Sequence, residues 1–136
     1  MCLTNASKVK IARKDIKCYK VALETEPNVF QGPYYGSKYI VDNSVQTVPH
    51  FETKADYFIV YYGFHSFRTK KSALKEISYW NNRFTSRGDD DIATVIECII
   101  PKGTQYFRGI FAPDIDALKC FASEKLIFTT NIFISK

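Results

Sequence analysis

Residues 55–67 read ADYFIVYYGFHSF, and this stretch decides the fold. Nearly every side chain in it is apolar, aromatic or β-branched, which is typical of a strand buried on both faces of a sheet. Gly63 interrupts the run and marks a bulge, a close approach to the backbone, or a break into two short strands. A helical pattern follows at once, so the stretch joins the predicted core strand to the predicted main helix.

The next segment predicts one main helix over about residues 69–86. Thr69 is placed to cap its N-terminus and Gly88 to cap its C-terminus. Apolar side chains recur at spacings of four, three and four and form one stripe at helical period: Ala73, Ile77, Trp80 and Phe84.

Strand patterns occur on both sides of this helix. They cover residues 15–23, 38–41, 92–100, 105–111 and 124–134. The stretches 24–36 and 42–54 read as loops, and 112–119 reads as a loop or one helical turn. Pro101-Lys102-Gly103-Thr104 reads as a type II turn. Strands, one long helix and further strands predict an α+β fold with a mainly antiparallel sheet.

Length and charge limit the classes of protein. A chain of 136 residues predicts one domain, 1–136, in which residues 1–14 form a basic arm. The net charge of +5 favours anionic partners such as nucleotides or nucleic acid. No apolar stretch reaches the roughly 20 residues that a membrane-spanning helix needs, so no membrane partner is expected.

The four cysteines are widely spaced and include no CxxC pair, so no structural zinc site is expected. Asp89, Asp90 and Asp91 read as a solvated turn, and no metal site is predicted. Free thiols and a polar N-terminal segment predict a cytoplasmic protein. Cys2 would become a candidate nucleophile if Met1 were removed, although an ordinary N-terminus is the simpler interpretation.

His65 and Ser66 are the most conspicuous polar residues near the core strand. Neighbours in a strand point to opposite faces, so the two cannot form a nucleophile–base pair directly. His65 is then either a packed core histidine or part of a pocket wall. Tyr34, Tyr35 and Tyr39 lie in a glycine-flanked stretch and form either a stacking platform for a base or a flap over the core.

Three motifs carry a resemblance over most of the chain: CYKV at 18–21, GFHSF at 63–67 and IPKGTQYFRG at 100–109. Their order resembles that in small uncharacterised proteins of bacteriophages and prophages. The resemblance implies a protein made in the cytoplasm of a bacterial host, where it counters host defence.

The same order resembles, more remotely, the ADP-ribosyltransferase fold. The resemblance places Tyr19-Lys20 at the Tyr-Arg pair of the first strand, His65-Ser66 near the Ser motif, and Glu124 near the catalytic Glu. Lys20 replaces Arg, which removes bidentate phosphate recognition, and Ala122 stands where many members have a second acid. The resemblance therefore implies a fold relative that binds without catalysis.

Together these features predict a non-catalytic binding protein for a nucleotide-like anion, without a cofactor. Lys20 and Arg108 would meet phosphate, and His65 and Ser66 would supply hydrogen bonds beside the two tyrosines, Tyr34 and Tyr35. One alternative is an ADP-ribosyltransferase-like enzyme that uses NAD, with Glu124 as its catalytic residue. Another is an inhibitor that binds a host protein or nucleic acid.

Overall fold

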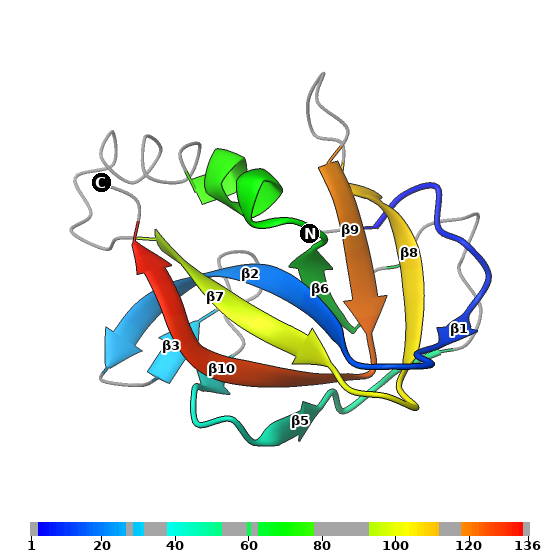
Figure 1. The fold of residues 1–136 in the computed structure, drawn as a ribbon, viewed down its shortest axis with the longest axis horizontal. Coiled ribbons are helices and arrows are strands. Elements are labelled where there is room, and N and C mark those ends of the chain that lie inside the picture. The colour runs from blue at the N-terminus through cyan, green and yellow to red at the C-terminus, as the bar shows by residue number, and fades with distance from the viewer. Residues whose placement is uncertain are drawn as a thin grey trace.

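The computed structural model describes residues 3–26, 29–31, 38–52, 60, 63–77, 93–111 and 118–134. Within these residues the chain forms one sheet of ten strands and a helix over residues 70–77 (Figure 1). All of the strand pairs are antiparallel. This arrangement confirms the predicted α+β class with a mainly antiparallel sheet, although the described helix is short.

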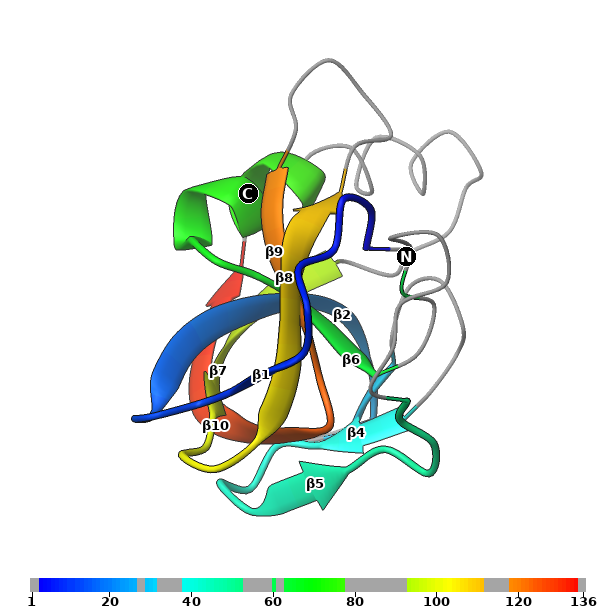
Figure 2. The ribbon, with the colours of Figure 1, turned by 90° about the vertical axis from the view of Figure 1, so that its right-hand side faces the viewer.

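The strands are β1 Lys10–Ile11, β2 Ile16–Glu26, β3 Val29–Gln31, β4 Lys38–Ile40, β5 Val45–Thr47, β6 Phe64–Phe67, β7 Ala93–Ile100, β8 Gln105–Phe111, β9 Leu118–Ser123 and β10 Lys125–Ile134. Their order in the sheet is β1-β8-β9-β6-β2-β7-β10-β5, with β3 joined to β2 and β4 joined to β3. Figures 1 and 2 place the helix at one end of the curved sheet and β5 at the other.

Both faces of the sheet are covered. One core cluster lies with the helix and includes Phe67, Ala73 and Ile77. The other lies with β3 and β4 and includes Phe30 and Phe64. All four residues of β6 are buried, as the apolar run predicts for a strand with two covered faces.

The N-terminus of the helix forms as its sequence predicts. Thr69 Oγ1 accepts a hydrogen bond of 3.1 Å from the backbone N–H of Ser72, which satisfies one of the free donors in the first turn. Lys70 places its ammonium 3.6 Å from the centre of the Phe133 ring, a cation–π contact between helix and sheet. The predicted residues 78–86 of the helix, and Gly88, lie outside the described residues.

Two glycines have a positive φ. Gly63 has a φ of +90° directly before β6, while residues 55–59, 61 and 62 of the predicted core strand lie outside the described residues. Gly103 has a φ of +88°, and Thr104 N–H donates a 3.1 Å hydrogen bond to Pro101 O, as a type II turn requires.

Four strands differ from the predictions, and one of them, β1, lies in the segment predicted as an arm. β3 and β5 lie in stretches that read as loops, and β9 begins inside the third predicted loop. β3 and β5 have three residues each, too few to show alternation. β9 reads LKCFAS, and its partners β6 and β8 hold it in place by long-range pairing.

The described part of the N-terminal segment, residues 3–14, packs against the sheet. Leu3 is buried and forms a bridge with Val60, and Thr4 forms one with Ile110. Gly109 makes this approach fit, because a Cβ there would lie 2.6 Å from Leu3 Cγ and from Thr4 O. The segment predicted as an arm is therefore part of the folded domain.

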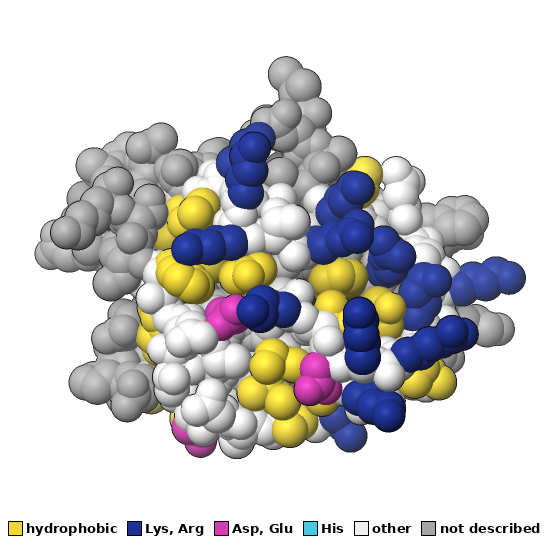
Figure 3. Space-filling model, viewed as in Figure 1, with side chains coloured by type: hydrophobic (Ala, Val, Ile, Leu, Met, Phe, Trp, Pro, Cys, Tyr) yellow, Lys and Arg dark blue, Asp and Glu magenta, His cyan; other side chains and the backbone are white. Residues whose placement is uncertain are grey.

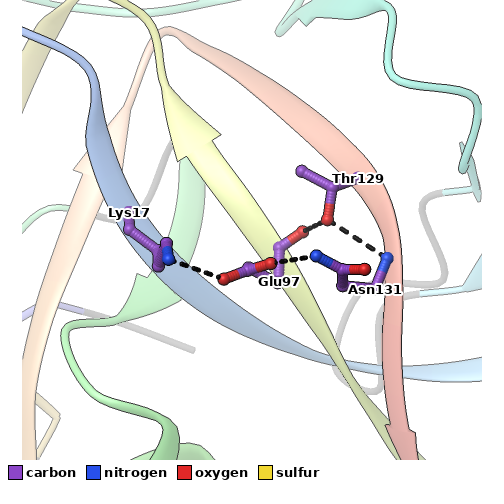
Figure 4. Close-up of polar contacts among 4 residues, drawn as sticks. All are labelled: Lys17, Glu97, Thr129 and Asn131. Carbon is purple, nitrogen blue, oxygen red and sulfur yellow. Dashed lines mark hydrogen bonds and ion pairs between the residues drawn. The ribbon is translucent and has the colours of Figure 1, made fainter.

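A polar network joins the three central strands where β10 is irregular (Figure 4). Lys17 Nζ lies 3.1 Å from Glu97 Oε1, while Asn131 Nδ2 donates to Glu97 Oε2. Thr129 Oγ1 donates a 2.6 Å hydrogen bond to Glu97 O. The Asn131 hydrogen bond is the main reason that the pKa of Glu97 lies below its usual value.

Candidate functional site

Exposed basic side chains gather on one face of strands β1, β8 and β9. Lys10 pairs with Tyr106, and Ile110 pairs with Lys119. Directly paired residues of antiparallel strands share a face, as do residues two apart along one strand. Lys10, Tyr106, Arg108 and Lys119 therefore lie on the same side of the sheet.

Arg68 extends this surface to the end of β6. Its backbone N–H donates a 3.0 Å hydrogen bond to Lys119 O, and it lies two residues after Ser66, which pairs with Phe121 on the same side as Arg108. We call the exposed cations on this side the basic face, and Figure 3 shows Lys and Arg side chains gathered over this region. Arg13 and Lys14 belong to this face because they line one groove with Lys10 and Tyr106. The basic face consists of Lys10, Arg13, Lys14, Arg68, Arg108 and Lys119.

Within the described part of the chain, the cations of the basic face form no ion pair. Lys17 pairs with Glu97, and the His50 ring lies 3.1 Å from Glu52, so neither contact includes a residue of this face. Unpaired cations on one surface create a positive potential that attracts anions.

A groove of about 390 Å³ lies at one end of the basic face. This volume falls within the range of roughly 300–1,000 Å³ that is usual for small-molecule sites. The Tyr106 ring is supported by an edge contact with Phe121, whose centroid is 5.8 Å away. The groove combines cations with an aromatic ring and aliphatic surface, and its lining residues are Lys10, Ile11, Arg13, Lys14, Ile16 and Tyr106.

Lys20, which was predicted to meet phosphate, lies inside the protein. Its side chain is 8 % exposed, and its ammonium donates a 2.7 Å hydrogen bond to His65 O. The ammonium also lies 5.1 Å from the centre of the Tyr39 ring. A ligand could reach this ammonium only after the surrounding side chains moved.

His65 and Ser66 point to opposite faces of β6, as predicted. Ser66 shares a face with Phe64, which packs in one core cluster. His65 shares a face with Phe67, which packs in the other. The ring of His65 has Nε2 3.1 Å from Val60 O and Nδ1 3.2 Å from Gly63 O. A neutral ring has one N–H and can donate to only one of these oxygens.

Burial, followed by the charge of Lys20, lowers the pKa of His65 to about 4. His65 is therefore neutral near pH 7. On the other face, Ser66 Oγ is buried near the thiol of Cys18 without a hydrogen bond of normal geometry. Burial raises the pKa of that thiol to about 12, so Cys18 is not a thiolate at neutral pH.

The structure brings some of the predicted site residues together and separates others. The Lys20 ammonium contacts the backbone oxygen of His65. Ser66 follows His65 on β6, the strand that pairs with β2. Arg108 is exposed on the basic face, with β9 and β6 between its strand and β2. Tyr34 and Tyr35 lie outside the described residues, whereas Tyr39 is buried and its ring stacks on Phe128.

Glu124 occupies the turn between β9 and β10. Its backbone N–H donates to Gln105 O and its carbonyl accepts from Val48 N–H, each at 3.0 Å. A cavity of about 190 Å³ lies nearby and is lined in part by Val48, Gly63 and Phe64. Its volume is below the range that is usual for small-molecule sites.

No protein-family model matches the chain, and no match was found among the curated proteins or the solved structures compared with it.

Within the described residues, no helix is long and apolar enough to cross a membrane.

Proposed function

We propose that this protein is a non-catalytic binding protein for a nucleotide-like anion, and that the groove beside Tyr106 holds the ligand. The supporting observation is the placement of Lys10, Arg13 and Lys14 around an aromatic ring, where none of them forms an ion pair with a carboxylate of the described part of the chain. The cations would donate charge-assisted hydrogen bonds to phosphate. A base would pack on Tyr106 and on Ile11, which is 61 % exposed.

The composition of the groove favours binding over catalysis. Its lining residues carry no carboxylate, imidazole or thiol. These are the groups that most often move protons or attack a substrate near neutral pH. The side chains of the groove are therefore suited to binding an anion. Under the resemblance to phage proteins, the ligand would be a nucleotide signal in the host cytoplasm.

Calorimetric titration with ADP, ADP-ribose, cyclic nucleotides and inorganic phosphate tests the proposal. At least one nucleotide should bind, and Arg13→Gln combined with Lys14→Gln should weaken it about tenfold or more, since charge-assisted hydrogen bonds are lost. Lys71→Gln combined with Lys125→Gln removes the same charge from exposed positions elsewhere and should leave affinity nearly unchanged. Equal weakening by both pairs, or no binding by any compound, would overturn the proposal.

A second function, transfer of ADP-ribose from NAD, is favoured by the order of the strands. β2, β6 and β9 are neighbours in the sheet. Lys20 lies on β2, Ser66 lies on β6 and Glu124 directly follows β9. These are the positions that the resemblance to the ADP-ribosyltransferase fold selects. Incubation with labelled NAD should then label a protein or nucleic acid, and Glu124→Gln should abolish the label. Transfer that survives this substitution rules out the assignment.

A further inference from the structure

The basic face extends well beyond the nucleotide-sized groove. Arg108, Lys119 and Arg68 continue it across β8 and β9 to the end of β6. We propose that the whole face binds single-stranded nucleic acid and that the groove beside Tyr106 is one nucleotide subsite along the strand. This inference rests on the proposed function and names the class of ligand.

The basic face is long enough to contact more than one phosphate. From β1 to β6 the sheet order is β1-β8-β9-β6, and at a spacing of roughly 4.8 Å per strand the crossing covers about 14 Å. A mononucleotide in the groove beside Lys10 would leave Arg68 and Lys119 without an anion. A chain of nucleotides supplies phosphates repeatedly, and so matches cations distributed over several strands.

The groove distinguishes a single strand from a duplex. Tyr106 and the exposed Ile11 present apolar surface beside the cations. Bases of a single strand can stack on such surfaces, whereas the bases of a duplex are already stacked within it. A duplex would use only the cations and would leave this surface without a partner.

Fluorescence anisotropy with thymidine oligonucleotides of about four, eight and twelve residues tests the inference, with the mononucleotide as competitor. Affinity should rise with length and fall steeply with salt. Each phosphate contact contributes about 0.7 to the slope of log K against log salt for single strands, so Arg68→Gln, Arg108→Gln and Lys119→Gln together should reduce the slope by about 2.

Two pairs of substitutions separate this inference from the proposed function. Arg68→Gln with Lys119→Gln should weaken the longest oligonucleotide about tenfold or more and leave mononucleotide binding unchanged, whereas Arg13→Gln with Lys14→Gln should weaken both. Lys71→Gln with Lys125→Gln is the charge-matched control. All of these positions are exposed, so the melting temperature should change little.

Each remaining outcome counts against the inference. Mononucleotide binding without any dependence on oligonucleotide length would overturn it and leave the proposed function standing. Failure of both ligands to bind would overturn both. A duplex of the same length that binds as tightly as the single strand would overturn the assignment to single strands.

Discussion

The ammonium of Lys20 donates a 2.7 Å hydrogen bond to the backbone oxygen of His65, and this contact ties β2 to β6 inside the sheet. The same ammonium faces the ring of Tyr39 on β4. Lys20 thus connects three strands through its side chain. These contacts give a buried lysine a structural role in the described fold, separate from the exposed cations of the basic face.

The contact between Lys20 and Tyr39 should be measurable as a coupling free energy. In a double-mutant cycle, Lys20→Met and Tyr39→Leu should together destabilise the protein by less than the sum of the single changes. The difference should be about 0.5–2 kcal/mol, the range for cation–π contacts. Urea unfolding measures each variant, and Lys20→Met with Phe107→Leu, whose ring lies in the other cluster, is the control. Additivity in the Tyr39 cycle would contradict the prediction.

His65 should make stability depend on pH between its ordinary pKa of 6.5 and the value of about 4 in the folded protein. The unfolded state binds the proton more readily, so the free energy of unfolding should fall as the pH is lowered through this range. The maximum loss is about 3 kcal/mol, from the size of the pKa shift. Chemical unfolding at several pH values measures it.

The matched variants for this experiment are His65→Gln and His50→Gln. His65→Gln should flatten the pH dependence between these two values even if it lowers the overall stability. His50 is exposed, and its replacement should preserve the wild-type slope. A slope that is unchanged in His65→Gln would show that other groups cause it.

Gly109→Ala should destabilise the protein by about 2 kcal/mol or more, because the added Cβ would overlap Leu3 and the backbone oxygen of Thr4. Gly103→Ala is the comparison, since its Cβ would meet nothing within 4 Å but its φ of +88° is strained for alanine. That change should cost about 1 kcal/mol. Thermal unfolding compares the two, and equal stability of Gly109→Ala and wild type would refute the packing of Leu3 against β8.

Thr69→Ala should lower the free energy of unfolding by about 1 kcal/mol, because the backbone N–H of Ser72 loses its acceptor. Thr69→Ser keeps a hydroxyl at the cap and should retain most of the stability. Urea unfolding of the two variants separates loss of the cap from loss of the methyl group. A Ser variant as unstable as the Ala variant would argue against capping.

The sequence predicts the parts of the fold that local patterns determine. The strand at 15–23, the strand at 105–111 and the cap at Thr69 all follow from alternation or from turn chemistry. β9 does not, because LKCFAS has no clear alternation and depends on pairing with β6 and β8. Such long-range pairing cannot be read from a short window of residues.

The candidate site is harder to predict for the same reason. The basic residues near the N-terminus are visible in the sequence, but their position beside Tyr106 depends on the pairing of β1 with β8. Arg68 and Lys119 come together only through the pairing of β6 with β9. Lys20 has the same charge as Lys14 and Lys17, and it lies in the interior because both faces of β2 are covered.

The irregular point in β10 determines which changes of chain length the protein can accept. Phe128 pairs with Cys98, and the next residue of β10 that pairs with β7 is Ile132, which pairs with Ile96. The step is four residues along β10 and two residues along β7. The surplus is an even number of residues, so Phe128 and Ile132 pack in the same cluster and Phe133 packs in the other. Deletion of one residue here would turn Phe133 away from Lys70 and the helix, whereas deletion of two would restore it. The interior thus responds to the parity of an insertion or deletion at this point more than to its size.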